Sequence, residues 1–285
     1  MSGSTHRRRY TEDGLLQRIE RESAAGTNER VYEASAFDHR RRPLAVEQGD
    51  AVRTSFAYDV VTERLLRLQT GAGGRVLQDL QYVYDAMGNI TQVRDGAQAV
   101  LYRDNAEVSA CNDYRYDALY RLVEASGREH EGQAANGRTP RASDAVVVPL
   151  RAGSPSDRRS MRRDVRKLVM SGEGVIEDRV YLGAQELYTK RRGATIVEKT
   201  LTEHAGGGLQ VDIKLIAQGK TIAQPVALRR YAVADHLGSS KLEVDPAGEV
   251  IAYEEFHPYG SSSYRAMRTG LAPCSSPCRR WRGVL

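Results

Sequence analysis

A strand–turn–strand pattern that occurs twice is the feature that most constrains this chain. Residues 82–90 are YVYDAMGNI, and residues 114–122 are YRYDALYRL. Each copy has an alternating Tyr-x-Tyr-Asp end, a short break and a second apolar run. Such alternation on both sides of a turn predicts a β-hairpin, and a repeated hairpin predicts an architecture assembled from these units. The sequence therefore predicts an all-β chain before it indicates any chemistry.

The break in the first copy contains residues that favour a tight turn. Asp85 can accept hydrogen bonds from backbone N–H groups one or two residues on, and Gly88 and Asn89 adopt positive φ at low cost. A five-residue connection is an ordinary hairpin loop. Tyr120 and Arg121 replace the Gly–Asn pair in the second copy. We therefore expect the second unit to turn differently.

The strands beside the first turn show a period of two. Leu80, Tyr82 and Tyr84 share one face, and strict alternation puts Ile90 and Val93 on opposite faces of the next strand. The residues that we expect to shape the repeated structure are Tyr84, Asp85, Gly88, Asn89, Tyr116, Asp117, Asp235 and Gly238.

Strand and turn signals divide the chain into four segments. Residues 1–130 and 166–264 have the hairpin pattern, whereas residues 131–165 are rich in Gly, Pro, Ser and Arg and predict a disordered linker. Residues 265–285 have no strand period and predict an unstructured tail. We interpret residues 206–208, three glycines in a row, as a flexible connection rather than a phosphate-binding loop, since no Lys-Ser/Thr follows.

Charge and cysteine content exclude several classes of function. The net charge is +5, and the arginine runs are scattered, which indicates a solvated surface rather than a nucleic-acid site. Cys111, Cys274 and Cys278 make no disulfide framework, and no second Cys/His pair supports a metal site. We predict no metal and no cofactor. No apolar leader or membrane-spanning run is present, so we expect no secretory signal peptide.

Two groups of residues are candidate reactive sites. His236 follows Asp235 and precedes Ser239, but no nucleophile elbow surrounds them, so we expect Asp235 to cap a turn with His236 half-exposed. Glu254 and Glu255 point to opposite faces of a strand and are poorly placed as an acid–base pair. The sequence thus predicts a protein that is not an enzyme.

The tyrosines allow a second interpretation. Tyr82, Tyr84, Tyr114 and Tyr116 could line a sheet that stacks sugars or bases, but the same residues serve as cross-strand packing. We favour packing. A carbohydrate, cell-surface or nucleic-acid binding module stays as an alternative, and glycan or DNA binding at physiological salt would favour it.

The motif YDxxGNI at residues 84–90 is similar to the YD repeat of the Rhs family. The run 80–95, followed by blocks 112–130, 235–243 and 253–260, resembles the C component of bacterial insecticidal toxin complexes. The resemblance implies that the hairpins form part of a curved or hollow β-shell around a variable C-terminal toxin. It also implies that a B component completes this shell and that a pore-forming A component delivers the toxin.

This chain departs from the resemblance after residue 260. The core motif, the aspartyl self-cleavage site and the toxin domain of the family do not follow, and Asp245 to Gly248 predict a hairpin turn instead. We hypothesise that the reading frame is truncated or interrupted. Core-motif coding in another frame just downstream of residue 264 would support this, and its absence in every frame would contradict it.

The resemblance leads to a structural role with one enzymatic alternative. We expect a non-enzymatic shell fragment, made in the bacterial cytoplasm and, in intact relatives, exported by a non-classical route. A toxin of the ADP-ribosyltransferase type is the alternative, and NAD-dependent labelling would reveal it. Free strand edges favour aggregation, so we predict a chain that is poorly soluble or partly unfolded alone.

Overall fold

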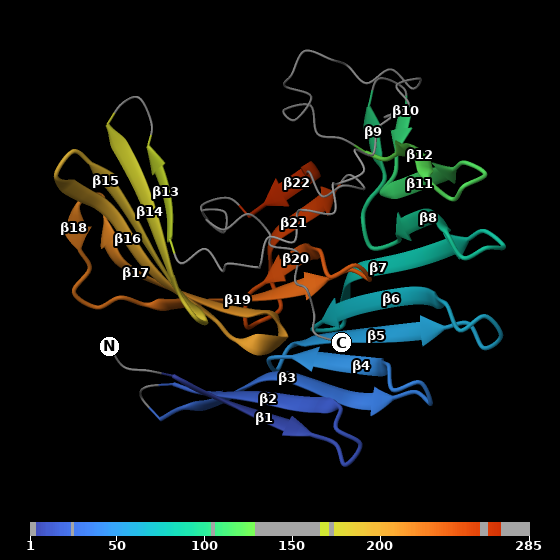
Figure 1. The fold of residues 1–285 in the computed structure, drawn as a ribbon, viewed down its shortest axis with the longest axis horizontal. Helices are drawn as coiled ribbons and strands as arrows, with labels where there is room; N and C mark the ends of the chain where they lie inside the picture. Colours follow the sequence, from blue (N-terminus) through green and yellow to red (C-terminus); the bar gives the residue numbers. More distant parts are fainter. Residues whose placement is uncertain are drawn as a thin grey trace, which may run out of the picture.

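The computed structural model describes residues 4–23, 26–103, 106–128, 166–170, 174–256 and 262–268. Within these ranges the chain forms two ten-stranded antiparallel sheets and one two-stranded sheet (Figure 1). The one helical element described there is a 3₁₀ turn, η2 (Gly206–Gly208). The prediction of an all-β fold is confirmed.

Sheet one contains the first part of the chain. Its strands follow the sequence order almost without exception. They are β1 (Thr5–Tyr10), β2 (Leu16–Glu22), β3 (Asn28–Phe37), β4 (Pro43–Gln48), β5 (Val52–Tyr58), β6 (Leu65–Ala72), β7 (Arg75–Tyr84), β8 (Ile90–Asp95), β11 (Cys111–Tyr116) and β12 (Leu122–Ser126). The small hairpin of β9 (Leu101–Arg103) and β10 (Ala106–Val108) lies between β8 and β11 in the sequence.

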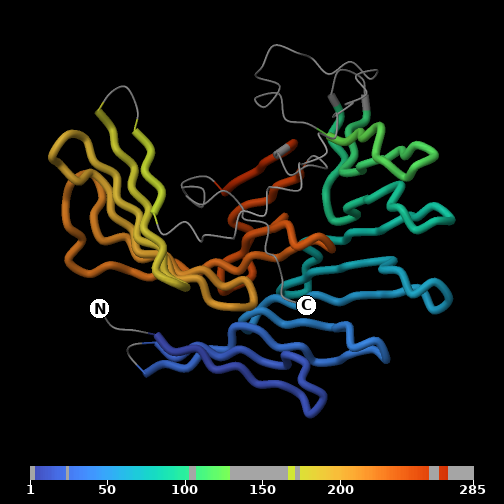
Figure 2. The backbone as a smooth tube through the Cα atoms, viewed as in Figure 1, coloured from blue at the N-terminus to red at the C-terminus, as the bar shows by residue number. Residues whose placement is uncertain are grey.

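Sheet two contains the second part of the chain. Its strands are β13 (Arg166–Met170), β14 (Val175–Leu182), β15 (Gln185–Arg192), β16 (Thr195–His204), β17 (Leu209–Ala217), β18 (Lys220–Thr221), β19 (Ala227–Ala234), β20 (Ser240–Val244), β21 (Val250–Phe256) and β22 (Ser262–Met267). β18 pairs only with β17, and the other strands follow one another across the sheet. The path of the backbone is therefore a succession of hairpins in both sheets (Figure 2).

The end of sheet two corrects one predicted boundary. We expected an unstructured tail from residue 265, but β22 continues through Met267 and pairs with β21. Pairing with a buried neighbouring strand supplies the order that the local sequence does not indicate. The predicted linker, residues 131–165, and residues 269–285 lie outside the described residues.

A β-bulge corrects the predicted faces of β8. Tyr84 pairs with Ile90 and Tyr82 pairs with Val93, so β8 has one extra residue between these pairs. Ile90 and Val93 consequently face the same side and pack with Leu80 in one apolar cluster. The extra residue of a bulge shifts the alternation by one, which strict period-two counting cannot anticipate.

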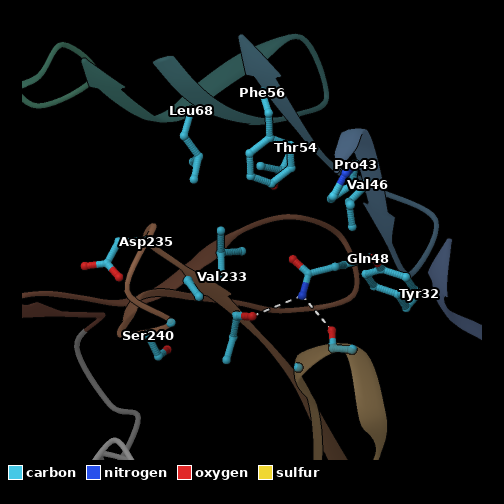
Figure 3. A pocket seen from close by; sticks show the side chains of 15 residues that line it. Tyr32, Pro43, Val46, Gln48, Thr54, Phe56, Leu68, Val233, Asp235 and Ser240 are labelled. Atoms are coloured by element: carbon cyan, nitrogen blue, oxygen red, sulfur yellow. Dashed lines mark hydrogen bonds between the residues drawn. The ribbon is translucent and has the colours of Figure 1, made fainter. Parts of the chain in front are cut away.

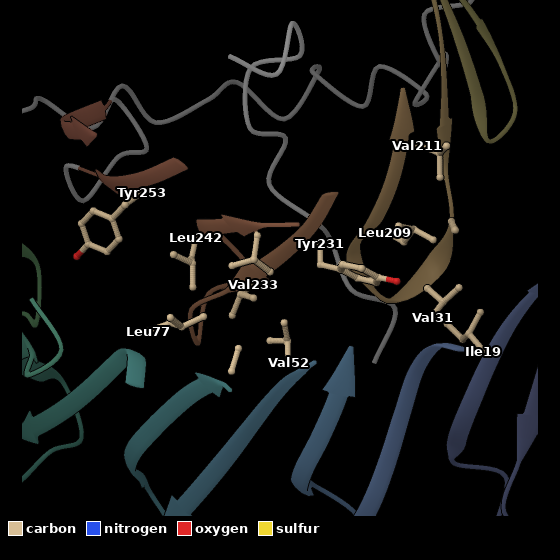
Figure 4. Packing of buried hydrophobic residues seen from close by; sticks show 13 residues of the cluster. Ile19, Val31, Val52, Leu77, Leu209, Val211, Tyr231, Val233, Leu242 and Tyr253 are labelled. Atoms are coloured by element: carbon tan, nitrogen blue, oxygen red, sulfur yellow. The ribbon is translucent and has the colours of Figure 1, made fainter. Parts of the chain in front are cut away.

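The two sheets pack against each other through a shared apolar core. Its buried residues come from β2, β3, β5, β6 and β7 of sheet one and from the β16–β21 region of sheet two. Figure 4 shows Val52 and Leu77 of sheet one opposite Val233 and Leu242 of sheet two. We call this contact between the sheets the seam. β13 to β16 extend away from sheet one beyond it (Figure 1).

Candidate functional site: hairpin tips and the seam

The loop at residues 85–89 is closed by a single carboxylate. The Asp85 N–H donates to the Asn89 carbonyl at 3.0 Å, and Oδ1 of Asp85 accepts from the N–H groups of Gly88 (2.7 Å) and Asn89 (2.8 Å). Oδ2 accepts from the Asn89 side-chain amide at 2.7 Å. Hydrogen bonds from the Asn89 side chain, and from backbone N–H groups, lower the pKa of Asp85 although desolvation opposes them. The carboxylate therefore fixes the turn as an anion.

The same loop recurs throughout both sheets. In loops 38–42, 117–121, 235–239 and 245–249, the N–H of the first residue, an aspartate, donates to the carbonyl of the fifth. Loop 11–15 has this bond with a threonine in the first position. In each case the fourth residue adopts positive φ, and these residues are Gly14, Arg41, Gly88, Tyr120, Gly238 and Gly248.

The second copy of the motif corrects a prediction. Tyr120 adopts a φ of 58°, and Oδ1 of Asp117 accepts from the N–H groups of Leu119 and Arg121 at 2.9 Å. The unit therefore turns in the same way as residues 85–89, although it lacks the Gly–Asn pair. Hydrogen bonds to the aspartate hold the geometry, and a non-glycine residue accepts the conformational cost, which is roughly 1 kcal/mol relative to glycine.

The second tyrosine of each repeat connects one hairpin to the preceding one. The Tyr84 hydroxyl donates to the Leu65 carbonyl at 2.8 Å, and the Tyr116 hydroxyl donates to the Ile90 carbonyl at 2.9 Å. Leu65 and Ile90 are the first residues of β6 and β8, directly after their loops. The tyrosine thus satisfies a carbonyl at the base of the neighbouring loop.

Arginines connect the loops to one another. Arg64 donates to the Asp85 carbonyl at 2.9 Å, with its guanidinium 5.5 Å from the Tyr84 ring centroid. Arg42 donates to the Glu63 carbonyl at 2.5 Å and stacks 3.8 Å from the ring centroid of Tyr58. Adjacent tips of sheet one therefore form a continuous hydrogen-bonded row.

The expectation that the tyrosines pack, rather than present a flat binding face, agrees with their surroundings. Tyr82 is buried, and Tyr84 and Tyr114 pack against its cluster. Burial raises the pKa of Tyr114 to about 12.

The three consecutive glycines lie in the seam and are not a flexible connection. A Cβ on Gly207 would lie 2.5 Å from Cβ of Tyr32, and a Cβ on Gly208 would lie 2.5 Å from the Ala232 carbonyl oxygen. Gly207 and Gly208 adopt φ values of 74° and 89°. The Gln48 amide also donates to the Gly207 carbonyl at 2.6 Å. The prediction of flexibility was wrong because tertiary contacts enclose this turn.

One end of the seam has a buried ion pair between the sheets. Arg21 of β2 donates to both carboxylate oxygens of Glu203 of β16, at 2.9 and 2.8 Å, and to Glu29 at 2.7 Å. Ser4 and His6 also contact Glu203. Burial alone would raise the pKa of Glu203, but hydrogen bonds from Arg21, Ser4 and His6 lower it to about 2.

The other end of the seam has a second buried cluster. Arg128, just after β12, donates to Glu255 of β21 at 2.8 Å, and the Tyr253 hydroxyl donates to the same carboxylate at 2.7 Å. The Tyr253 hydroxyl also lies 3.1 Å from Asp95 of sheet one. Glu255 is buried, whereas Glu254 is partly exposed, so the two acids differ in environment as alternation predicts.

The predicted turn at Asp235 touches sheet one. Oδ1 of Asp235 accepts from the N–H groups of Leu237 and Ser239, each at 2.9 Å, so the aspartate caps the turn as predicted. The His236 ring meets the Tyr82 ring edge-on at 4.7 Å, and Nδ1 lies 3.1 Å from the Tyr82 hydroxyl. The histidine therefore contacts a buried tyrosine rather than an activated serine.

A pocket of about 280 Å³ opens between the sheets beside η2. Figure 3 shows Phe56 and Leu68 on one side and Val233 on the other. Gln48 closes one end through hydrogen bonds to the carbonyls of Gly207 and Ala232. Its walls are mainly apolar, so the pocket offers packing surface rather than a reactive group.

Two features are absent from the described residues. No cluster of three or more His, Cys, Asp or Glu side chains suited to a metal ion is present among them. In those same ranges no helix is long and apolar enough to cross a membrane.

Comparison with known proteins finds similarity to bacterial toxin subunits. No protein-family model matches the chain. It is 24% identical to toxin subunit YenC1 of Yersinia entomophaga over 92% of this chain and 38% of YenC1. It is 36% identical to toxin subunit YenC2 of the same organism over 46% of this chain and 14% of YenC2. The chain thus spans well under half the length of these relatives.

Solved structures show the same fold. The Tc holotoxin pore of Photorhabdus luminescens matches with a TM-score of 0.68 at 20% identity, over 93% of this chain and 17% of that chain. The TcdB2–TccC3 crystal structure matches with a TM-score of 0.69 at 21% identity, over 94% of this chain and 18% of that chain. Together with the sequence matches, these structures show that the chain is an all-β homologue of the toxin subunits YenC1 and YenC2, with the fold of part of a Tc toxin assembly.

Proposed function

We propose that this chain is a wall segment of a toxin-complex shell, with a steric rather than an enzymatic role. In a longer relative, the wall would enclose a C-terminal toxin until delivery. The observation that carries the proposal is the continuous row of similar hairpins, whose tips and tyrosines are hydrogen-bonded from one unit to the next. Such a row makes a large sheet without dedicating any side chain to catalysis.

The chemistry of the polar groups supports a structural role. The aspartates of the loops are used by backbone N–H groups, and the buried acids Glu203 and Glu255 are paired with arginines of the opposite sheet. A catalytic carboxylate needs access to a substrate, whereas these groups close turns or join sheets.

The partners follow from the relatives. We propose that a B component completes the wall and that a pore-forming A component delivers the contents. Support comes from the solved assemblies that share this fold, one of TcdB2 with TccC3 and one of a holotoxin pore. Export by a non-classical route, after synthesis in the bacterial cytoplasm, belongs to the same proposal.

A chimera of YenC1 tests the proposal. This chain would replace the stretch of YenC1 that it matches, and the chimera would be assembled with a B component. We expect the part of YenC1 that follows the stretch to resist limited proteolysis to the same extent in the chimera as in intact YenC1 assembled and digested in parallel. Digestion at the rate of the isolated C-terminal part would contradict the proposal, and NAD-dependent labelling by the chain alone would replace it with the enzymatic alternative.

A further inference from the structure

One end of the seam buries two carboxyl groups on either side of a single phenol. The hydroxyl oxygen of Tyr253 in β21 lies 2.7 Å from Oε1 of Glu255 and 3.1 Å from Oδ2 of Asp95, the last residue of β8. Figure 4 shows the Tyr253 side chain extending from sheet two toward sheet one. The exposed fraction is 4% for Tyr253, 2% for Glu255 and 5% for Asp95, so all three groups are withdrawn from bulk solvent.

The number of hydrogens at these contacts does not fit two ionised acids. A tyrosine hydroxyl has one hydrogen to donate, and an ionised carboxylate can only accept. Burial raises the pKa of Tyr253 well above its usual value, so the hydroxyl keeps its hydrogen. With both acids ionised, one of the two contacts would bring two acceptor oxygens together with no hydrogen between them. A hydrogen on one carboxyl group removes this conflict, because a neutral carboxyl donates through its O–H.

The charges of the cluster lead to the same number of hydrogens. Arg128 donates to Oε1 of Glu255 at 2.8 Å, and among the described residues it is the one cation that forms an ion pair with either acid. Two ionised acids beside one guanidinium would leave a net negative charge in the interior, where an unpaired charge is costly. One bound proton makes the cluster neutral.

The neighbouring groups on the other strands are uncharged or already paired. Tyr82 of β7, Tyr114 of β11 and Tyr264 of β22 lie near the cluster, and phenols carry no charge near neutral pH. Asp79 of β7 forms an ion pair with Arg67 of β6. These neighbours therefore leave the charge of the cluster unbalanced.

The surroundings of the two acids indicate which of them holds the proton. Arg128 favours the ionised form of Glu255, because it donates to the carboxylate. Oδ1 of Asp95 accepts from the N–H groups of Asp79 at 2.9 Å and Ala97 at 3.1 Å, as the carbonyl oxygen of a neutral carboxyl can. Oδ2 of Asp95 is then the O–H oxygen, directed at Tyr253.

We propose that Asp95 holds a proton at neutral pH and that this proton latches one end of the seam. Asp95 donates to Tyr253, Tyr253 donates to Glu255, and Glu255 is paired with Arg128, so the chain of hydrogen bonds joins β8 of sheet one to β21 of sheet two. Loss of the proton would set two carboxylate charges against one hydroxyl and loosen the contact. The proposal does not depend on the wall function.

The latch responds to pH in the opposite direction from the Arg21–Glu203 end of the seam. An unfolded chain releases the proton of an aspartate above about pH 4, whereas the folded chain retains it at Asp95. Folding therefore takes up one proton at this site near neutral pH. Each unit of increase in pH should then lower the equilibrium constant for folding about tenfold through this site.

Infrared spectroscopy of the full chain tests the proton directly, because the carbonyl stretch of a neutral carboxyl differs from the bands of ionised carboxylates. At pH 7 we expect this band in the difference spectrum of the wild type minus Asp95→Asn. Asp113→Asn is the matched control, since Asp113 is exposed and accepts from the Gln92 side chain, and its difference spectrum should lack the band. A wild type without any neutral-carboxyl band at pH 7 would overturn the proposal, whether or not the variants fold.

Urea denaturation of the same variants measures the effect on the seam. Asp95→Asn replaces the neutral acid by an amide of the same shape, which can donate to Tyr253 and accept from both N–H groups. Between pH 5 and pH 7, the folding constant of Asp95→Asn relative to that of the wild type should rise about a hundredfold, one factor of ten for each pH unit. The ratio for Asp113→Asn should stay constant. A constant ratio for Asp95→Asn as well would show that Asp95 is ionised in the folded chain, and the proposal would be wrong.

Discussion

The hairpin tips and the seam both require residues with positive φ, but they tolerate substitution differently. At the tips, one aspartate satisfies the loop backbone, so Tyr120 occupies the position that Gly88 occupies in the first copy. At the seam, Gly207 and Gly208 are enclosed by Tyr32 and Ala232. A loop held by its own hydrogen bonds is permissive, and a turn held between two sheets is not.

The largest expected effect is at the seam. Gly208→Ala would place a Cβ 2.5 Å from a backbone oxygen at a φ of 89°. We expect a loss of about 4 kcal/mol or more in the free energy of unfolding, measured by urea denaturation. Gly14→Ala is the matched control, because Gly14 has a φ of 80° with nothing within 4 Å, and should cost only about 1 kcal/mol. Equal losses would remove the distinction between the two regions.

The buried ion pair is the next largest contribution to the seam. Glu203→Ala leaves Arg21 buried without its main partner, and we expect a loss of roughly 3 kcal/mol in the free energy of unfolding. The exposed pair of Arg115 and Glu124 is the control, and Glu124→Ala should cost about 0.5 kcal/mol or less. Similar effects of the two substitutions would show that the seam pair is solvated.

Acid should weaken the seam through the same carboxylate. The folded-state pKa of Glu203 is lowered to about 2 from an ordinary value of 4.5. Its stabilisation is therefore fully present above pH 4.5 and is lost as the pH falls toward 2, by roughly 3 kcal/mol in all. Comparing the free energy of unfolding of the wild type with that of Glu203→Gln across this pH range isolates the contribution of the Glu203 carboxylate. A constant difference between them would contradict the assignment.

The smallest expected effect is at a tip, and it is a gain. Tyr120→Gly relieves a non-glycine residue at a φ of 58° and should raise the free energy of unfolding by about 1 kcal/mol at most. Gly88→Ala should lower it by a similar amount. A gain with Tyr120→Gly as large as the loss at Gly208 would mean that the tips store strain.

The sequence was sufficient where structure is local. Alternation and turn residues predicted the hairpins at Asp85 and Asp235 because their hydrogen bonds lie within five residues. The same turn at Tyr120 was missed, because the prediction weighed glycine preference above the capping aspartate. The sequence did contain a usable signal, because Asp117 stands at the first position of its five-residue loop, as Asp85 does.

The sequence was insufficient where contacts are distant. The three glycines were taken for a flexible connection because their neighbours Ile19 and Tyr32 lie far away in the sequence. The ion pair of Arg21 with Glu203 was not predicted for the same reason, because its two residues lie far apart in the sequence. In β22, Ser262 pairs with Phe256, and these two residues have the same separation in the sequence as the paired residues Tyr84 and Ile90. This separation could have been used to predict that the second segment continues through β22.

The most direct test asks whether the seam, rather than the connecting chain, holds the sheets together. A specific protease site inserted between residues 131 and 165 would allow the full chain to be cut after folding. The two halves should then co-elute in gel filtration at neutral pH, and Gly208→Ala should let them separate. Separation of the wild-type halves immediately after the cut would contradict a seam that joins the two sheets into one wall.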